Sequence, residues 1–152
     1  MSPSELEQYL HQHIPLSEAM QVSVMDVQPE GIVLGAPLLP NLNHRGTVFG
    51  GSASAVAILA AWSLLHVRLL GEDISSRLVI QHNTMRYEHP INGAFTARSF
   101  IPEPQAWAAF TRTLRRRGRA RIGVECVLNY AGQKAGHLDG TFVALGMDER
   151  SK

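Results

Sequence analysis

The sequence contains a single cysteine, Cys126, in 152 residues. One cysteine excludes an internal disulfide and any metal site built from several cysteines, and it fits a reducing compartment. The formal net charge is only +1, so no overall charge favours binding to nucleic acid or to an anionic membrane. The N-terminal segment has neither a basic start nor an apolar core, which excludes a signal peptide there. We therefore expect a cytoplasmic protein.

Acidic residues are absent from residues 31–70. This stretch holds a polar loop over 41–49, a glycine pair at 50–51, and a helical run that has no polar face over 53–65. A helix that is apolar on all sides is expected to be buried on all sides. Polar side chains interrupt the run at its ends and no second apolar run of this length follows, so a membrane-spanning helix is disfavoured.

The remaining pattern predicts one domain over residues 1–152 with a substantial core, since 45% of the residues are hydrophobic. Around a long helix at 51–70, it predicts helices at 2–13 and 105–117 and strands at 20–27, 32–36, 77–88, 94–101, 119–130 and 134–147. We expect strand 94–101 to return antiparallel to strand 77–88, and Asp139–Gly140 to interrupt the last strand. Hairpin connections indicate an antiparallel sheet, and a long helix in its concave face gives an α+β fold.

The start of the long helix is the first candidate site. The backbone N–H groups of Gly51 and Ser52 lack helical partners there, and such a helix end favours an anion or a developing oxyanion. Glycine leaves room for a substrate to approach the backbone closely. The alternative interpretation is a purely structural buried helix, in which the glycine pair only makes a tight start.

Two segments carry a resemblance to a known family. They are Pro40–Ser52, which reads Pro-Asn-Leu-Asn-His-Arg-Gly-Thr-Val-Phe-Gly-Gly-Ser, and Tyr87–Ile91, which reads Tyr-Glu-His-Pro-Ile. Over nearly its whole length the chain resembles the thioesterase domain at the C-terminus of some YiiD-type proteins, within the hotdog-fold thioesterase superfamily. The resemblance implies a curved antiparallel sheet wrapped around a long central helix. It also implies an acyl-CoA thioesterase that forms homodimers, often stacked into homotetramers, with the active site at the dimer seam.

Two departures from the wider hotdog pattern, of the PaaI type, affect the chemistry. That pattern has an asparagine, then Gly-Thr-Val-His-Gly-Gly, then a catalytic carboxylate two turns into the helix. Asn43, residues 46–48 and the glycine pair at 50–51 match it in spacing. Phe49 stands in place of the histidine, and Ile58 falls at the position of the carboxylate. The usual general base is therefore missing from the helix.

Other groups are then needed to activate water. Asn43 is a candidate to orient the water, with His44, or else His82, as the proton acceptor, because histidine titrates near neutral pH. The alternative for Asn43 is a loop asparagine bonded to its own backbone, and for His44 a solvent-facing residue. Ser52 and Ser54 are the available nucleophiles. Covalent catalysis is disfavoured because no His–Asp partner is recognisable, and Ser52 is better explained as a helix cap.

The residues expected to contact the substrate lie in the loop, on the helix and in one strand. They are Asn41, Phe49, Gly50, Ser54, His82 and Asn83, the last two if their strand crosses the dimer seam. Arg117 and Arg119 belong to a basic run at 115–121, and the resemblance implies that such arginines hold the phosphates of coenzyme A. The alternative is a solvated helix end. Nucleic-acid binding is disfavoured because no aromatic platform accompanies the arginines, and no metal is expected because the histidines lack ligand spacing.

The sequence therefore predicts a hydrolase that cleaves a small-molecule acyl thioester, of coenzyme A or of an acyl carrier protein, into acid and free thiol. It needs no cofactor beyond the coenzyme A of its substrate. The alternative is a non-catalytic hotdog protein that binds acyl-CoA or an acyl lipid and has lost the carboxylate. A hydratase or dehydratase is disfavoured, because hotdog dehydratases pair a histidine with a helix carboxylate that this helix lacks.

Overall fold

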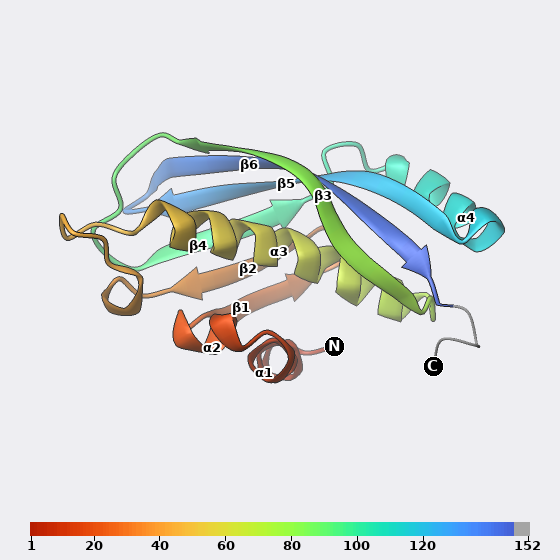
Figure 1. Cartoon of the computed structure of the whole chain (residues 1–152), viewed down its shortest axis with the longest axis horizontal. Coiled ribbons are helices and arrows are strands. Elements are labelled where there is room, and N and C mark those ends of the chain that lie inside the picture. Colours follow the sequence, from red (N-terminus) through yellow and green to blue (C-terminus); the bar gives the residue numbers. More distant parts are fainter. Residues whose placement is uncertain (148–152) are drawn as a thin grey trace.

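The computed structural model describes residues 1–147 (Figure 1). In chain order its elements are α1 (Pro3–His13), α2 (Pro15–Ala19), β1 (Ser23–Gln28), β2 (Gly31–Ala36), the 3-10 turn η1 (Leu39–Asn41), α3 (Gly50–Gly71), β3 (Ser76–Tyr87), β4 (Phe95–Phe100), α4 (Ala106–Arg117), β5 (Arg119–Tyr130) and β6 (Gln133–Gly146). The six strands form one antiparallel sheet in the order β1-β2-β4-β5-β6-β3, which curves around α3. The predicted α+β architecture is confirmed.

The core lies between α3 and the concave face of the sheet. Small and branched side chains recur on one side of α3 and have no exposed surface, namely Val56, Ala57, Ala60, Ala61 and Leu64. Their spacing of three and four residues places them on one face of the helix. The alternating residues of β5 meet them from the sheet, with Val124 and Cys126 fully buried. Alanines on the helix let the strands approach closely, so the sheet can wrap tightly.

Three sequence-based expectations are corrected by the structure. β3 and β4 are not paired: β4 lies between β2 and β5, whereas β3 pairs only with β6, at the edge of the sheet. β6 is continuous through Asp139–Gly140, because β5 and β3 hydrogen-bond to it on both sides. Residues 15–22, where a strand was expected to begin, form α2 and a turn, and β1 starts at Ser23.

The composition of α3 predicts burial on all sides, but the structure shows that one face is only partly covered. One face, which includes Ala55, Ile58, Trp62 and His66, is only half-buried, because the two edges of the curved sheet do not close over it. This face is flanked by α2 and β3, and part of it forms an apolar cavity with them. α3 has the length and hydropathy of a membrane span, but 56% of its most apolar window is buried inside the fold, as in a core helix.

Candidate active site at the start of the long helix

The loop that leads into α3 is anchored by a buried asparagine. Asn41 is 1% exposed, and its amide nitrogen donates to the backbone oxygens of Met20 at 3.0 Å and Pro37 at 2.8 Å. Its backbone carbonyl oxygen accepts from the backbone N–H of Phe49 at 2.7 Å. Asn41, expected from the sequence to contact the substrate, thus fixes both ends of the loop.

Asn43 shapes the tip of the same loop. Its side-chain oxygen accepts from the N–H groups of Arg45 at 2.8 Å and Thr47 at 3.2 Å, and its nitrogen donates to the Thr47 hydroxyl at 2.7 Å. Both ends of the amide are therefore engaged within the loop, as in the alternative interpretation of this residue. His44 is exposed at the tip. Gly46 follows at a φ of +80°, a left-handed conformation that favours glycine.

The first turn of α3 has no side-chain cap. Phe49 occupies the cap position, and the first helical hydrogen bond runs from the N–H of Ala53 to its carbonyl oxygen at 3.0 Å. Ser52 does not cap the helix, contrary to expectation, because it lies inside the first turn. Within residues 1–147, the N–H groups of Gly50, Gly51 and Ser52 have no hydrogen-bond acceptor. These are the unpaired donors that a helix start presents to an anion.

Two aromatic rings flank these donors. A Cβ built on Gly51 would lie 2.4 Å from Cε1 of Phe49, so the Phe49 ring lies directly on the glycine backbone. A Cβ built on Gly50 would lie 3.5 Å from Cε1 of Tyr87 and 3.8 Å from its hydroxyl oxygen. Both rings are more than half exposed. The start of α3 is therefore open to a ligand between Phe49 and the end of β3.

A cavity of about 370 Å³ opens beside Gly50. Its walls come from the helix start, the segment after β3 and the ends of β5 and β6, namely Val48, Gly50, Ala53, Tyr87, Glu88, His89, Pro90, Ile91, Leu128 and Ala135. The lining includes an acidic residue, Glu88, and a histidine, His89, neither of which the sequence analysis assigned to the site. The signal was present in the Tyr87–Ile91 motif, but the chain alone does not show that this segment meets the helix.

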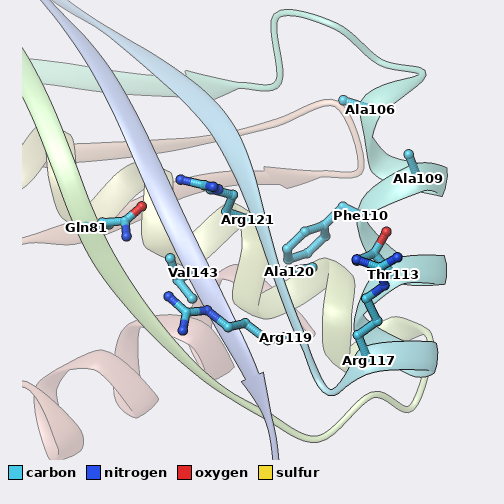
Figure 2. A pocket seen from close by; sticks show the side chains of 10 residues that line it. All are labelled: Gln81, Ala106, Ala109, Phe110, Thr113, Arg117, Arg119, Ala120, Arg121 and Val143. Carbon is cyan, nitrogen blue, oxygen red and sulfur yellow. The ribbon is translucent and has the colours of Figure 1, made fainter.

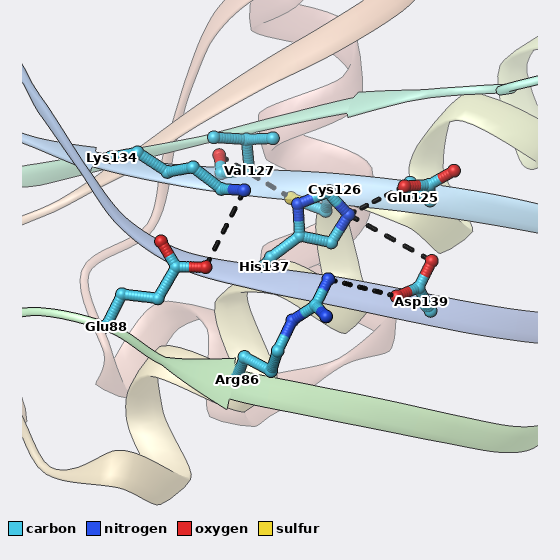
Figure 3. A network of polar contacts seen from close by, with 8 residues as sticks. All are labelled: Arg86, Glu88, Glu125, Cys126, Val127, Lys134, His137 and Asp139. Carbon is cyan, nitrogen blue, oxygen red and sulfur yellow. Dashed lines mark hydrogen bonds and ion pairs between the residues drawn. The ribbon is translucent and has the colours of Figure 1, made fainter.

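The segment after β3 is held rigidly against the sheet and the loop. The N–H groups of Glu88 and His89 both donate to the carbonyl oxygen of Ala135, at 2.9 and 3.1 Å. The N–H of Val48 donates to the carbonyl oxygen of Ile91 at 2.7 Å. Figure 3 shows Glu88 just beyond the end of β3, with its carboxylate 3.6 Å from Nζ of Lys134.

A second, apolar cavity lies further along α3. It has a volume of about 420 Å³ and is lined only by apolar side chains of α2, α3, β3 and β6 and their flanks, namely Ile14, Leu16, Met20, Ala55, Ile58, Leu59, Trp62, Leu78, Val79, Ile80 and Phe142. This lining includes Ile58, which falls at the carboxylate position of the PaaI-type pattern. We call this cavity the apolar slot.

Three other residues expected at the site lie along α3 or on the edge strand. Ser54 is half-buried and one turn into the helix. His82 is exposed and paired with Thr141, and Asn83 is half-buried and paired with Gly140. Neighbouring residues of a strand point to opposite faces of the sheet, so His82 and Asn83 do not share one surface. A register shift between Ile80 and His82 marks a bulge at this point.

The two arginines expected to bind phosphate lie far from the start of α3 within one chain. Arg117 ends α4, and Arg119 and Arg121 follow at the start of β5, where they line a groove of about 760 Å³ together with Gln81, Phe110 and Thr113 (Figure 2). Among residues 1–147, no carboxylate lines this groove. Leu128, which lines the cavity beside Gly50, is nine residues along β5 from Arg119, a separation of roughly 30 Å at ~3.3 Å per residue.

One further group of polar side chains lies on the outer face of the sheet (Figure 3). Nε2 of His137 is 2.6 Å from Glu125 and 4.0 Å from Asp139, whose other oxygen is 3.8 Å from Arg86. The possible ligand atoms of Glu125, His137 and Asp139 lie within 4.8 Å of one another, a spacing that suits a cation. The hydrogen bond and the ion pair already account for this arrangement.

Comparison with known proteins places the chain in a family. The model of the family described as "Putative thioesterase (yiiD_Cterm)" matches residues 3–146. A protein of unknown function from Chlorobaculum tepidum superimposes with a TM-score of 0.90 at 26% identity, over 96% of this chain and 98% of that one. A protein from Shewanella oneidensis that shares the thioesterase description gives 0.83 at 25% identity, over 94% and 96%. A thioesterase from Haemophilus influenzae has the same fold at 12% identity, with a TM-score of 0.79 over 100% and 96%. The chain belongs to the yiiD C-terminal thioesterase family of hotdog-fold proteins.

Proposed function

We propose that the protein hydrolyses an acyl thioester of coenzyme A, or of an acyl carrier protein, to the acid and the free thiol. The observation that carries this proposal is the set of unpaired N–H groups on Gly50, Gly51 and Ser52, next to a cavity of about 370 Å³. Attack on a thioester carbonyl moves negative charge onto its oxygen. Donors aimed at that oxygen stabilise the transition state, and one such donor is typically worth about 10²–10³ in rate.

The apolar slot supports an acyl group as the part of the substrate that is recognised. Its lining contains no charged or hydrogen-bonding side chain except the indole of Trp62, whose Nε1 donates to the carbonyl oxygen of Leu78. Burial of an acyl chain there is favourable by about 0.8 kcal/mol for each methylene group. The replacement of a carboxylate by Ile58 extends this apolar surface along the helix.

The loop residues keep their proposed roles in positioning and proton transfer. Asn43 sets the loop conformation through its side-chain hydrogen bonds to Arg45 and Thr47. His44, at the exposed tip, is the proton acceptor that the sequence suggests, and His82 is the alternative. Ser54 and Asn83, both half-buried along α3 and β3, are the remaining polar groups proposed to contact the substrate near Phe49.

We further propose a homodimer or homotetramer in the cytoplasm. Two observations favour it. β3 is a 12-residue edge strand that pairs only with β6 within the described part of the chain, and such an edge is a template for a second copy. Arg117 and Arg119 also lie about 30 Å from the start of α3 along β5, so arginines of a second copy are better placed to hold the nucleotide phosphates of coenzyme A.

Thiol release from a panel of short, medium, long and aromatic acyl-CoAs tests the proposed reaction. The expected result is hydrolysis of at least one member of the panel, with turnover lowered in the Asn43→Ala variant. A comparable loss in His44→Ala identifies His44 as the proton acceptor. Absence of thiol release across the whole panel contradicts the proposal. Saturable binding of acyl-CoA by calorimetry without turnover instead supports the second candidate, a non-catalytic acyl-CoA or acyl-lipid binder, which the missing helix carboxylate favours.

A further inference from the structure

Among the described residues that line the cavity beside Gly50, Glu88 is the acidic one. We propose that Glu88 is the general base that activates water for attack on the thioester, in place of the carboxylate that α3 lacks. This inference rests on the proposed thioesterase activity. It replaces His44 and His82 as the proton acceptor, and it assigns the base to the segment between β3 and β4 in place of the helix or the loop at 41–49.

The position of Glu88 follows from three contacts. Its backbone N–H and that of His89 share the carbonyl oxygen of Ala135, at 2.9 and 3.1 Å, so the segment cannot rotate freely. The Tyr87 ring lies against Gly50, with its hydroxyl oxygen 3.8 Å from a Cβ built on that glycine. The backbone that carries Glu88 is therefore fixed at the wall of the cavity that adjoins the unpaired donors of α3.

The side chain of Glu88 is accessible to water but held in place. Its exposure is 35%, and Oε1 lies 3.6 Å from Nζ of Lys134, which is 44% exposed (Figure 3). A screened ion pair of this kind contributes little to stability, and the contact with Lys134 is made by one of the two carboxylate oxygens. Two titratable residues of the same segment, Tyr87 and His89, line the cavity together with Glu88, and Lys134 on β6 pairs with its carboxylate.

The chemical step balances without a cofactor. The carboxylate of Glu88 takes a proton from water while the water oxygen forms a bond to the thioester carbonyl carbon. The carbonyl electrons move to the oxygen, which the N–H groups of Gly50 and Gly51 stabilise. When the carbonyl re-forms, the C–S bond breaks, and the proton on Glu88 passes to the leaving thiolate. The products are a carboxylic acid and a thiol, and Glu88 is again a carboxylate.

The alternatives for the base are placed less favourably. His44 is exposed at the loop tip and does not line the cavity, and His82 is exposed on the edge strand. His89 lines the cavity and is exposed, as Glu88 is, but a histidine base would give a different dependence of rate on pH. These differences make the base identifiable by experiment.

The test compares wild type with Glu88→Gln, Glu88→Ala and a matched control, Glu103→Gln, at an exposed glutamate far from the cavity. The measurements are kcat and kcat/KM for the best acyl-CoA of the panel, as a function of pH. We expect Glu88→Gln to lower kcat by about 10²–10⁴ with KM changed little, and to abolish the fall of kcat/KM at acidic pH. Glu103→Gln should behave as wild type.

Added formate provides a readout that a structural role would not change. A small carboxylate can occupy the space left in Glu88→Ala and accept the proton, so formate should raise the rate of this variant and not that of Glu88→Gln. Thermal unfolding of each variant establishes that it is folded. An active wild type with an equally active Glu88→Gln overturns the assignment of Glu88 but keeps the thioesterase. An inactive wild type overturns both.

Discussion

The ring of Tyr87 packs against the backbone of Gly50, within 3.5 Å of where a Cβ on that glycine would lie. This contact joins the end of the edge strand β3 to the first turn of α3. It also places the next residue, Glu88, in the cavity that adjoins the unpaired helix donors. The protein thereby combines donors for an oxyanion with a carboxylate, although its long helix carries no acidic residue.

The contact between Gly51 and Phe49 predicts that a single methyl group at residue 51 lowers turnover. A Cβ at residue 51 would lie 2.4 Å from Cε1 of Phe49, so Gly51→Ala must displace the ring. We expect turnover to fall by about tenfold to a hundredfold, because small misplacements at a reacting centre are costly. The melting temperature should not fall, since alanine favours a helix by about 1 kcal/mol over glycine.

The Phe49→Ala background provides the control. In this background Gly51→Ala should have little further effect on turnover, and an equal loss in both backgrounds would refute the steric explanation.

The apolar slot predicts a change in chain-length preference at Ile58. A larger ring in Ile58→Phe fills the slot, so kcat/KM should shift toward shorter acyl-CoAs, and Ile58→Ala should shift it toward longer ones. Each methylene group that loses its burial costs about 0.8 kcal/mol, or about fourfold in kcat/KM. Rates with acetyl-CoA serve as the control and should stay close to wild type. Unchanged preferences in both variants would place the acyl chain elsewhere.

Cys126 is predicted to be inert in the folded protein. It has no exposed surface, and burial raises the pKa of its thiol to about 12, against a smaller opposing effect of Arg98. The nucleophilic thiolate is therefore scarce at neutral pH. Titration with a thiol reagent should detect no reactive thiol in the native protein and one per chain in concentrated guanidinium chloride. Rapid reaction of the native protein would contradict this and would also complicate thiol-release assays.

His66 is predicted to make the fold sensitive to acid. It stacks on Tyr9 and Trp62 at centroid distances of 4.7 and 4.6 Å, and its Nε2 is buried without a hydrogen-bond partner in the described chain. Burial, and then the nearby His13, lower its pKa from the usual value of 6.5.

Because this pKa is lowered on folding, the unfolded chain binds the proton more readily than the folded one. The contribution to stability is present above pH 6.5 and is lost as the pH falls through the folded-state pKa. Urea unfolding at a series of pH values should show a smaller acid loss for His66→Phe, which keeps the stack and cannot be protonated. The same acid loss in this variant and in wild type would exclude His66 as the cause.

Local pattern was sufficient to predict much of the fold. Alternation in β5 predicted its buried face, and the glycine pair with the apolar run predicted α3 and its unpaired start. The pairing of β3 was not predictable in this way, because hydrophobic alternation does not identify which strand lies alongside. At the paired positions Tyr87 and Gly136, its partner β6 lies 49 residues further along the chain.

The candidate site was predicted only in part, for the same reason. Residues adjacent in sequence to the helix start, such as Phe49 and Gly50, were identified because they belong to one continuous motif. Glu88 is separated from Gly50 by the whole of α3 and β3, and only the tertiary contact of Tyr87 with that glycine brings it into the cavity. For Arg119, sequence chemistry suggested phosphate binding but could not show its distance from the helix start.

The central claim is that thioester hydrolysis takes place at the first turn of α3. The most direct measurement is thiol release from the acyl-CoA panel by wild type beside Gly50→Val, whose side chain would extend toward Tyr87 and close the cavity opening. Gly50 has a negative φ, so the substitution causes no backbone strain. We predict hydrolysis by wild type and a loss of turnover in a Gly50→Val protein that remains folded. Equal turnover by the two proteins, or none by wild type, would contradict the account.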